Sequence, residues 1–137
     1  MTSPPRGPAA GLLLAGQYVA AAIEQRVRSE RLSAAEALLL VELRAGPLTM
    51  NAVRQALAIE KSTATSLIDR LERRDLVNRK PNPADGRSLL VSLSRSGQRA
   101  ARKSAAAIEA VDEQLSQVSE SALRGHRQVI QRLLNLS

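Results

Sequence analysis

Residues 76–93 interrupt a chain whose apolar residues otherwise recur at helical spacing. Two short apolar runs, 76–80 and 89–93, have the length and composition of strands. The eight residues between them contain two prolines and an Asp-Gly-Arg triplet, which are typical of a turn or loop. This pattern predicts a single β-hairpin with a long tip, set between helical segments.

Helical periodicity begins near the N-terminus. A first helix is expected over about 11–29, where Leu and Val residues repeat at intervals of three and four. Ser33 is a good N-cap for a second helix, and Glu36 three residues later completes a capping box. Gly46-Pro47 ends this helix.

Two shorter helices precede the hairpin. Thr49 caps the first, which breaks at Ala58-Ile59, and the second covers about 61–74. The second carries an i, i+3, i+4, i+7 apolar stripe formed by Ala64, Leu67, Ile68 and Leu71. Two short helices with apolar inner faces and a tight turn between them predict a helix-turn-helix. A long helix is expected after Ser94, and a last helix after Ser119.

Composition limits the class of protein. The 137 residues fit one domain, with residues 1–10, rich in proline, as a flexible arm and 11–137 as the folded part. There is no Cys and a single His, which disfavours a zinc site, so neither a metal nor a cofactor is expected. The apolar stretch near residue 11 is too short to cross a membrane. We therefore expect a soluble cytoplasmic protein without a membrane partner.

The positive charge is concentrated in the middle of the chain. Residues 51–103 contain twelve Arg or Lys and five Asp or Glu, so this segment alone carries the net charge of +7. A basic segment in an otherwise nearly neutral chain favours a polyanionic partner, with nucleic acid as the first candidate.

The 61–74 helix directs small polar and basic side chains away from its apolar stripe. Its outward face holds Ser62, Ser66, Asp69 and Arg73, flanked by Thr63, Thr65 and Arg70. Hydroxyl groups near a helix N-terminus, followed by arginines, suit a helix that enters the major groove of DNA. The same residues are also ordinary on a solvated helix face, so this face does not decide the matter alone.

The hairpin strengthens the case for DNA. A loop that follows a helix-turn-helix, carries Lys80 and Arg87 and is stiffened by two prolines is typical of a wing, which places an arginine in the minor groove. In this interpretation the carboxylate of Asp85 holds the guanidinium of Arg87 in one direction, and Gly86 allows the tip to turn.

These features resemble the MarR family of bacterial winged-helix regulators. The resemblance is carried by residues 48–101, with the KSTATSLIDRLERR helix and the Asp85-Gly86-Arg87 wing in order and spacing, and it extends over about 11–135. It implies a homodimer formed by helices at 11–30 and 95–137, with a DNA-binding lobe at 33–93, on a palindromic operator. Ala58 and Asp75 stand where the family often has Gly; Asp tolerates a left-handed conformation better than Ala.

The resemblance also implies roles for particular residues. The wing pair would be Asp85 and Arg87, with Arg87 in the minor groove. The residues that would face the major groove are Lys61, Ser62, Thr63, Thr65, Ser66 and Arg70. A small-molecule effector would bind between the dimerisation helices and the lobe. Because Tyr18 is the only aromatic residue, such a ligand would meet mainly Leu, Val, Ala and Arg side chains.

Three functions remain open from the sequence. The first is a sequence-specific dimeric regulator of transcription, acting as a repressor on double-stranded DNA. The second is an architectural protein that binds DNA without sequence preference, and the third is a winged helix that serves only protein contacts. An enzyme is disfavoured because the chain has no Gly-x-Ser-x-Gly elbow and no phosphate loop.

Overall fold

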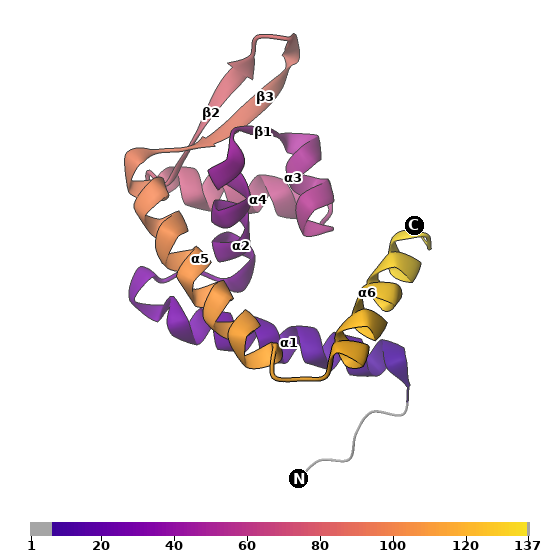
Figure 1. Ribbon diagram of the computed structural model, residues 1–137. Coiled ribbons are helices and arrows are strands. Elements are labelled where there is room, and N and C mark those ends of the chain that lie inside the picture. Colours follow the sequence, from indigo (N-terminus) through magenta and orange to yellow (C-terminus); the bar gives the residue numbers. More distant parts are fainter. Residues whose placement is uncertain (1–6, 137) are drawn as a thin grey trace.

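The hairpin and the helices around it form one continuous structure in the computed structural model, which describes residues 7–136. The helices are α1 (Pro8–Arg26), α2 (Ala34–Glu42), α3 (Met50–Leu57), α4 (Lys61–Arg73), α5 (Arg95–Leu115) and α6 (Glu120–Leu134), with 3₁₀ helices η1 (Arg28–Glu30) and η2 (Leu43–Ala45). The strands are β1 (Leu48–Thr49), β2 (Val77–Asn82) and β3 (Asp85–Leu93). The predicted mainly helical, winged helix-turn-helix fold is confirmed (Figure 1).

The N-terminal helix starts earlier than the sequence indicated. Pro8 is the first residue of α1, so residues 8–10 belong to a helix and not to a flexible arm. Proline is favourable at the first helical position because the N–H it lacks would have no partner within the helix. Residues 1–6 of the expected arm lie outside the described residues.

Capping residues place the next two helices as predicted. The Ser33 hydroxyl accepts a hydrogen bond from the N–H of Glu36 at 3.1 Å, and Glu36 Oε1 accepts from the N–H of Ser33 at 2.9 Å. The hydroxyl of Thr49 accepts from the N–H of Ala52 at 3.1 Å and caps α3. Both predicted caps are confirmed.

The turn between α3 and α4 depends on a left-handed alanine. Ala58 has φ 54° and ψ 48°, a conformation that crowds its Cβ against the backbone. Asp75, after α4, has φ 57° and takes the left-handed conformation that the sequence suggested for it. The apolar stripe of α4 lies in the core as predicted, and its four members, Ala64, Leu67, Ile68 and Leu71, are at most 2% exposed.

The wing, which we define as the hairpin of β2 and β3, is longer and its tip tighter than the sequence predicted. The strands extend to Asn82 and Asp85, so only Pro83 and Ala84 form the turn, and the long tip was wrong. Gly86 lies within β3 without a positive φ and does not make the turn. Pro81 is compatible with β2 because β2 is an edge strand and because its pairing with β3 shifts register between Pro81 and Asn82, both of which are settings where proline is tolerated.

A short strand that the sequence did not reveal joins the wing to the helix-turn-helix. Leu48 and Thr49 of β1 pair antiparallel with Val91 and Leu90 of β3, giving the sheet order β1-β3-β2. Two residues are too few for a period-of-two pattern to appear in a sequence.

The start of α5 is held against the corner between α4 and β2. A methyl group at Gly97 would lie 1.8 Å from the backbone oxygen of Leu76, so only glycine fits this contact. Ser94 caps α5 by accepting from the N–H of Gly97 at 2.9 Å, and its hydroxyl donates to the carbonyl of Asp75. The wing therefore has a fixed attachment at both of its ends.

The hydrophobic core lies where helices α1 to α5 meet the base of the sheet, and it includes Ile23, Leu40, Val53, Val91 and Ala101. The last helix has no share in it. None of the residues described in α6 is buried, and the helix stands away from the helix-turn-helix (Figure 1). Large apolar side chains remain exposed on the N-terminal half of α1 and on α6, namely Leu13, Leu14, Tyr18, Ile130, Leu133 and Leu134.

Replacing Ala58 by glycine should stabilise the protein. Glycine removes the Cβ clash of the left-handed conformation but adds freedom to the unfolded chain, so the net gain should be about 0.5–1 kcal/mol. Urea unfolding followed by circular dichroism measures this gain. Asp75→Gly is the matched control, and its gain should be smaller because Asp tolerates this conformation. An unchanged or lower midpoint for Ala58→Gly would contradict the assignment of strain to Ala58.

Candidate DNA-binding surface

The face of α4 opposite the core carries the predicted residues. Lys61, Ser62, Thr63, Ser66, Arg70 and Arg73 are exposed. Thr65 is only half-buried, and its hydroxyl donates to the carbonyl of Lys61 at 3.0 Å, which leaves its oxygen able to accept from an external donor. The exposed face therefore presents hydroxyls in its first turns and arginines further along.

Arg70 of α4 and Arg74, the residue after α4, reach back to the corner between α1 and α2. Nε of Arg70 lies 3.9 Å from Oε2 of Glu36. Glu36 as a residue is only 7% exposed, and its carboxylate also completes the capping box with Ser33. The guanidinium of Arg74, the residue after α4, donates to the carbonyls of Glu30 and Arg31. Arg70 is 52% exposed in its side chain, so it stands between a buried carboxylate and solvent.

An arginine that the sequence reading missed fixes the angle between the wing and α4. Arg79 of β2 donates a hydrogen bond to the carboxylate of Asp69, and its Nε lies 3.5 Å from Oε1 of Glu72. Asp69 therefore faces the wing as part of an ion pair, although the helical wheel placed it on the outward face.

A signal for Arg79 was present in the sequence. Side chains alternate between the two faces of a strand, so Arg79 shares the inner face with Val77 while Lys80 points outward. Carboxylates at positions 69 and 72, three residues apart on α4, can converge on one such guanidinium.

The tip of the wing is held by short-range hydrogen bonds. Asn82 Oδ1 accepts from the N–H of Ala84 at 3.0 Å, and its Nδ2 donates to the hydroxyl of Ser88 at 3.0 Å. Asp85 Oδ1 accepts from the backbone N–H of Arg87 at 3.0 Å. The expected ion pair between Asp85 and the guanidinium of Arg87 is absent from the described residues. Asp85 thus orders the backbone at Arg87, and the side chain of Arg87 remains exposed.

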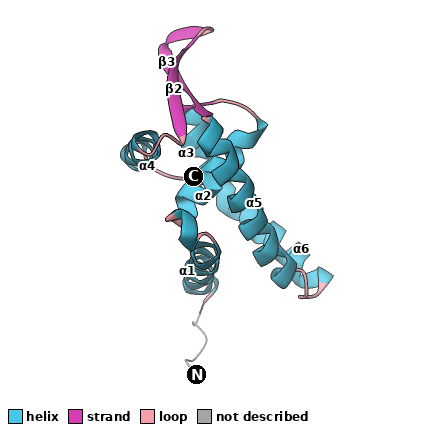
Figure 2. Cartoon of the chain, turned by 90° about the vertical axis from the view of Figure 1, so that its left-hand side faces the viewer, coloured by secondary structure: helices cyan, strands magenta, loops and turns pink. Residues whose placement is uncertain are grey.

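The wing projects beyond the helices, and α4 lies beside its base (Figures 1 and 2). Both elements carry exposed cations, namely Lys61, Arg70 and Arg73 on α4 and Lys80 and Arg87 on the wing. A positive helix face next to a projecting positive hairpin is complementary to the phosphates along a duplex.

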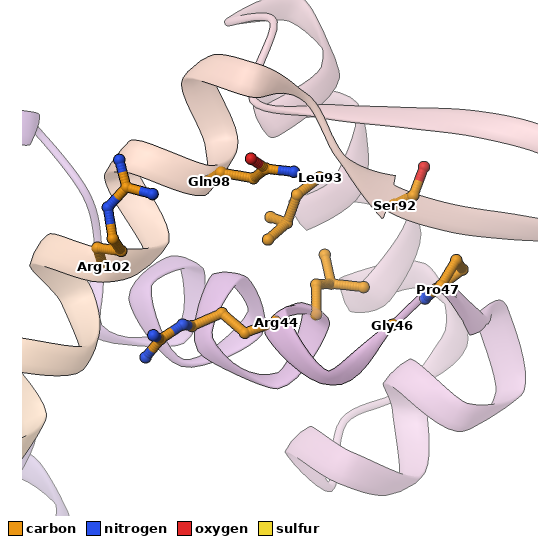
Figure 3. Close-up of a pocket in the computed structure, with 8 residues that line it drawn as sticks. Arg44, Gly46, Pro47, Ser92, Leu93, Gln98 and Arg102 are labelled. Carbon is orange, nitrogen blue, oxygen red and sulfur yellow. The ribbon is translucent and has the colours of Figure 1, made fainter.

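A separate cavity lies between this lobe and α5. It has a volume of about 340 Å³ and is lined by Leu43, Arg44, Gly46, Pro47, Ser92, Leu93, Gln98 and Arg102. Arg44 and Arg102 come from facing elements at one end, with Pro47 and Ser92 at the other (Figure 3). No acidic side chain from the described part of the chain lines the cavity, so its polar end suits an anionic group.

Comparison with known proteins identifies the family. Residues 32–88 match a model of the MarR family. A probable transcriptional regulator from Pseudomonas aeruginosa has 30% sequence identity and a TM-score of 0.73 over 92% of this chain and 96% of that chain. This chain belongs to the MarR family of transcriptional regulators. The resemblance inferred from its motifs is confirmed.

Two further structures relate to this MarR-family chain. BpsR of Bordetella bronchiseptica, whose DNA binding is regulated by 6-hydroxynicotinic acid, has 25% identity and a TM-score of 0.78, with 100% of this chain and 99% of that chain covered. The MepR–DNA complex of S. aureus, at 20% identity, has the same fold, with a TM-score of 0.83 over 97% and 100% of the two chains. A search of curated proteins found no match.

No helix within residues 7–136 of this MarR-family chain is long and apolar enough to cross a membrane.

Loss of Arg79 should loosen the wing. Arg79→Ala removes both contacts to α4, and because Asp69 and Glu72 are each 44% exposed, solvent screening should limit the loss in unfolding free energy to about 1 kcal/mol. Amide hydrogen exchange in β2 and β3 should become faster. Lys103→Ala, which breaks the Lys103–Glu30 pair between α5 and η1, is the control and should leave exchange in the wing unchanged. Wild-type exchange in the Arg79→Ala wing would contradict this role.

Proposed function

We propose that this MarR-family protein is a sequence-specific repressor that binds a palindromic operator as a homodimer. The observation that carries the proposal is the fixed pairing of α4 with a projecting wing through Arg79, which presents two positive elements at a constant angle. In this proposal α4 enters the major groove and the wing reaches the adjacent minor groove.

The proposed DNA contacts are those that the sequence indicated. Lys80 binds a phosphate, Arg87 enters the minor groove, and Asp85 sets the backbone from which Arg87 extends. The contacts assigned to the major groove are Lys61, Ser62, Thr63, Thr65, Ser66, Arg70 and Arg73. For Arg70 this requires the side chain to leave Glu36, which is feasible because the Nε to Oε2 distance is already 3.9 Å.

The exposed apolar side chains of α1 and α6 support a homodimer. Leu13 and Tyr18 are 66% and 73% exposed, and Leu133 is 45% exposed, in helices that otherwise have the apolar spacing of a packed face. Several large apolar side chains left exposed on two helices are typical of a subunit interface. A two-fold dimer places two copies of α4 on one duplex, which requires a palindrome with half-sites about one helical turn apart.

The cavity between the lobe and α5 supports control by a small-molecule effector. Arg44 and Arg102 at one end favour a carboxylate or another anion, and Leu43, Pro47 and Leu93 provide apolar contacts. The cavity borders both the base of the wing and α5, so a ligand there acts on the junction between the DNA-binding lobe and the proposed dimer helices. The regulation of BpsR by 6-hydroxynicotinic acid is a precedent for a small acidic effector.

A second candidate is an architectural protein that binds DNA without sequence preference. Ser62 and Ser66 favour it, because serine has a short side chain and reads base edges less selectively than arginine or asparagine. Selection from a pool of random duplexes distinguishes the two functions. A repressor should enrich one palindromic sequence. A pool that shows no common sequence after repeated rounds would contradict the repressor and support the architectural protein.

Arg87→Ala should weaken binding to the enriched duplex by about 1–3 kcal/mol. Asp85→Ala should weaken it less, because it removes only the carboxylate that accepts from the Arg87 N–H. Asp85→Asn keeps an acceptor oxygen at this position and should bind at least as well as Asp85→Ala. Fluorescence anisotropy measures all three affinities, and equal binding by Arg87→Ala and the parent would contradict the minor-groove assignment.

Leu133→Asp should dissociate the dimer. A carboxylate placed in an apolar interface should weaken association by about 2 kcal/mol or more, which is a change of more than tenfold in the dissociation constant. Gln128→Asp, an exposed change elsewhere on α6, is the control. Sedimentation velocity over a range of concentrations measures the dissociation constant of each variant. A parent dissociation constant for Leu133→Asp would exclude this face of α6 from the interface.

A further inference from the structure

A second cleft lies between the helix-turn-helix and the wing. It has a volume of about 530 Å³ and brings together three cations from three elements: Arg54 of α3, Lys61 of α4 and Arg87 of β3. Among residues 7–136, Asp85 is the only acidic residue that lines it, and Oδ1 of Asp85 already accepts from the backbone N–H of Arg87. The cleft therefore has a strong excess of positive charge in a confined space.

Arg54 is the most unusual member of this group. Its side chain is half-buried, and its Nε is shielded from solvent without a hydrogen-bond partner among residues 7–136. A buried N–H of a charged group is unfavourable when nothing accepts from it. Nε itself lies out of reach of a ligand, but Arg54 also forms no ion pair among residues 7–136. Its guanidinium therefore lines a cationic cleft without an acidic partner, which favours an external anion.

The position of the cleft suggests which anion this is. If α4 occupies the major groove and the wing the adjacent minor groove, the sugar–phosphate strand that separates these grooves must pass between them. The cleft lies there, between the first turn of α4 and the inner side of the wing, with the start of α3 as its floor. A phosphate group carries the acceptor oxygens and the negative charge that Arg54 lacks.

We propose that this cleft holds the phosphate strand between the two grooves, with Arg54 as a direct phosphate contact. This inference rests on the proposed function and adds Arg54 and Asn51 to the surface that touches DNA. A phosphate contact carries no sequence information, so Arg54 sets the register and the salt dependence of binding, while Arg87 contributes to selectivity.

The test measures affinity for a duplex of unrelated sequence and for the enriched duplex, each across a range of salt concentrations. Arg54→Gln should lower the slope of log affinity against log salt by about 1.8, because the homodimer loses one phosphate contact of about 0.9 in each protomer, and should weaken both duplexes by the same factor. Arg54→Lys should retain the parent slope. Arg124→Gln, a change of equal charge on α6, is the control and should also retain it. A parent slope in Arg54→Gln would overturn the inference.

Asn51→Asp provides a variant that should fold well. Asn51 is exposed in the first turn of α3, where a carboxylate is favourable for the helix dipole, yet the added charge would repel a phosphate in the cleft. We expect an unchanged or higher melting temperature together with weaker binding to both duplexes. Parent affinity in this variant would also overturn the inference.

Two further outcomes distinguish a DNA contact at Arg54 from a site for a free phosphate ligand. A protein that binds no duplex at any salt concentration would contradict both the inference and the proposed function, whereas DNA binding with no change in Arg54→Gln contradicts the inference alone. Titration with pyrophosphate identifies a free phosphate ligand. Pyrophosphate binding that depends on Arg54, with the parent salt slope for DNA in Arg54→Gln, would assign the cleft to a small molecule and overturn the DNA contact.

Discussion

The contact of Arg79 with Asp69 and Glu72 connects the two elements on which the DNA-binding surface depends. A two-stranded hairpin has little stability by itself, and its direction is set by what its base packs against. Here the base is fixed by pairing with β1, by the close approach of Gly97 to Leu76, and by this charged bridge to α4. These contacts together set the position of the wing relative to α4, and a set position is what simultaneous entry into adjacent grooves requires.

The end of α4 also contacts the segment that joins α1 to α2. Arg74 holds the carbonyls of Glu30 and Arg31, and Lys103 of α5 pairs with the side chain of Glu30 at 2.6 Å. The segment between α1 and α2 thus contacts both the C-terminal end of α4 and the long helix α5, which precedes α6. With α1 and α6 as the proposed dimer interface, these contacts would link the geometry of the dimer to the position of α4, and the proposed ligand beside α5 would act on the same junction.

The elements most visible in the sequence were those with local causes. The caps at Ser33 and Thr49 and the stripe of α4 follow from short-range rules, and they were predicted correctly. The tight turn at Pro83-Ala84 was missed because proline and glycine indicate a turn without fixing its length. Strand alternation placed Arg79 on the inner face of the wing, but it did not show which helix that face meets. Gly97 and Arg54 were missed for a different reason. Their roles depend on residues brought together by the fold, and no periodicity in the chain marks such contacts.

The most direct test of sequence-specific repression is the affinity of the protein for DNA flanking its own gene, compared with a scrambled duplex of equal length across a range of salt concentrations. A specific repressor should prefer one flanking sequence by about 10³-fold or more at physiological salt. The preference should remain as salt rises, since base contacts are less sensitive to counterions than phosphate contacts are. If the protein binds every duplex tested equally and with a steep salt dependence, including duplexes recovered from the genome, a sequence-specific repressor is contradicted.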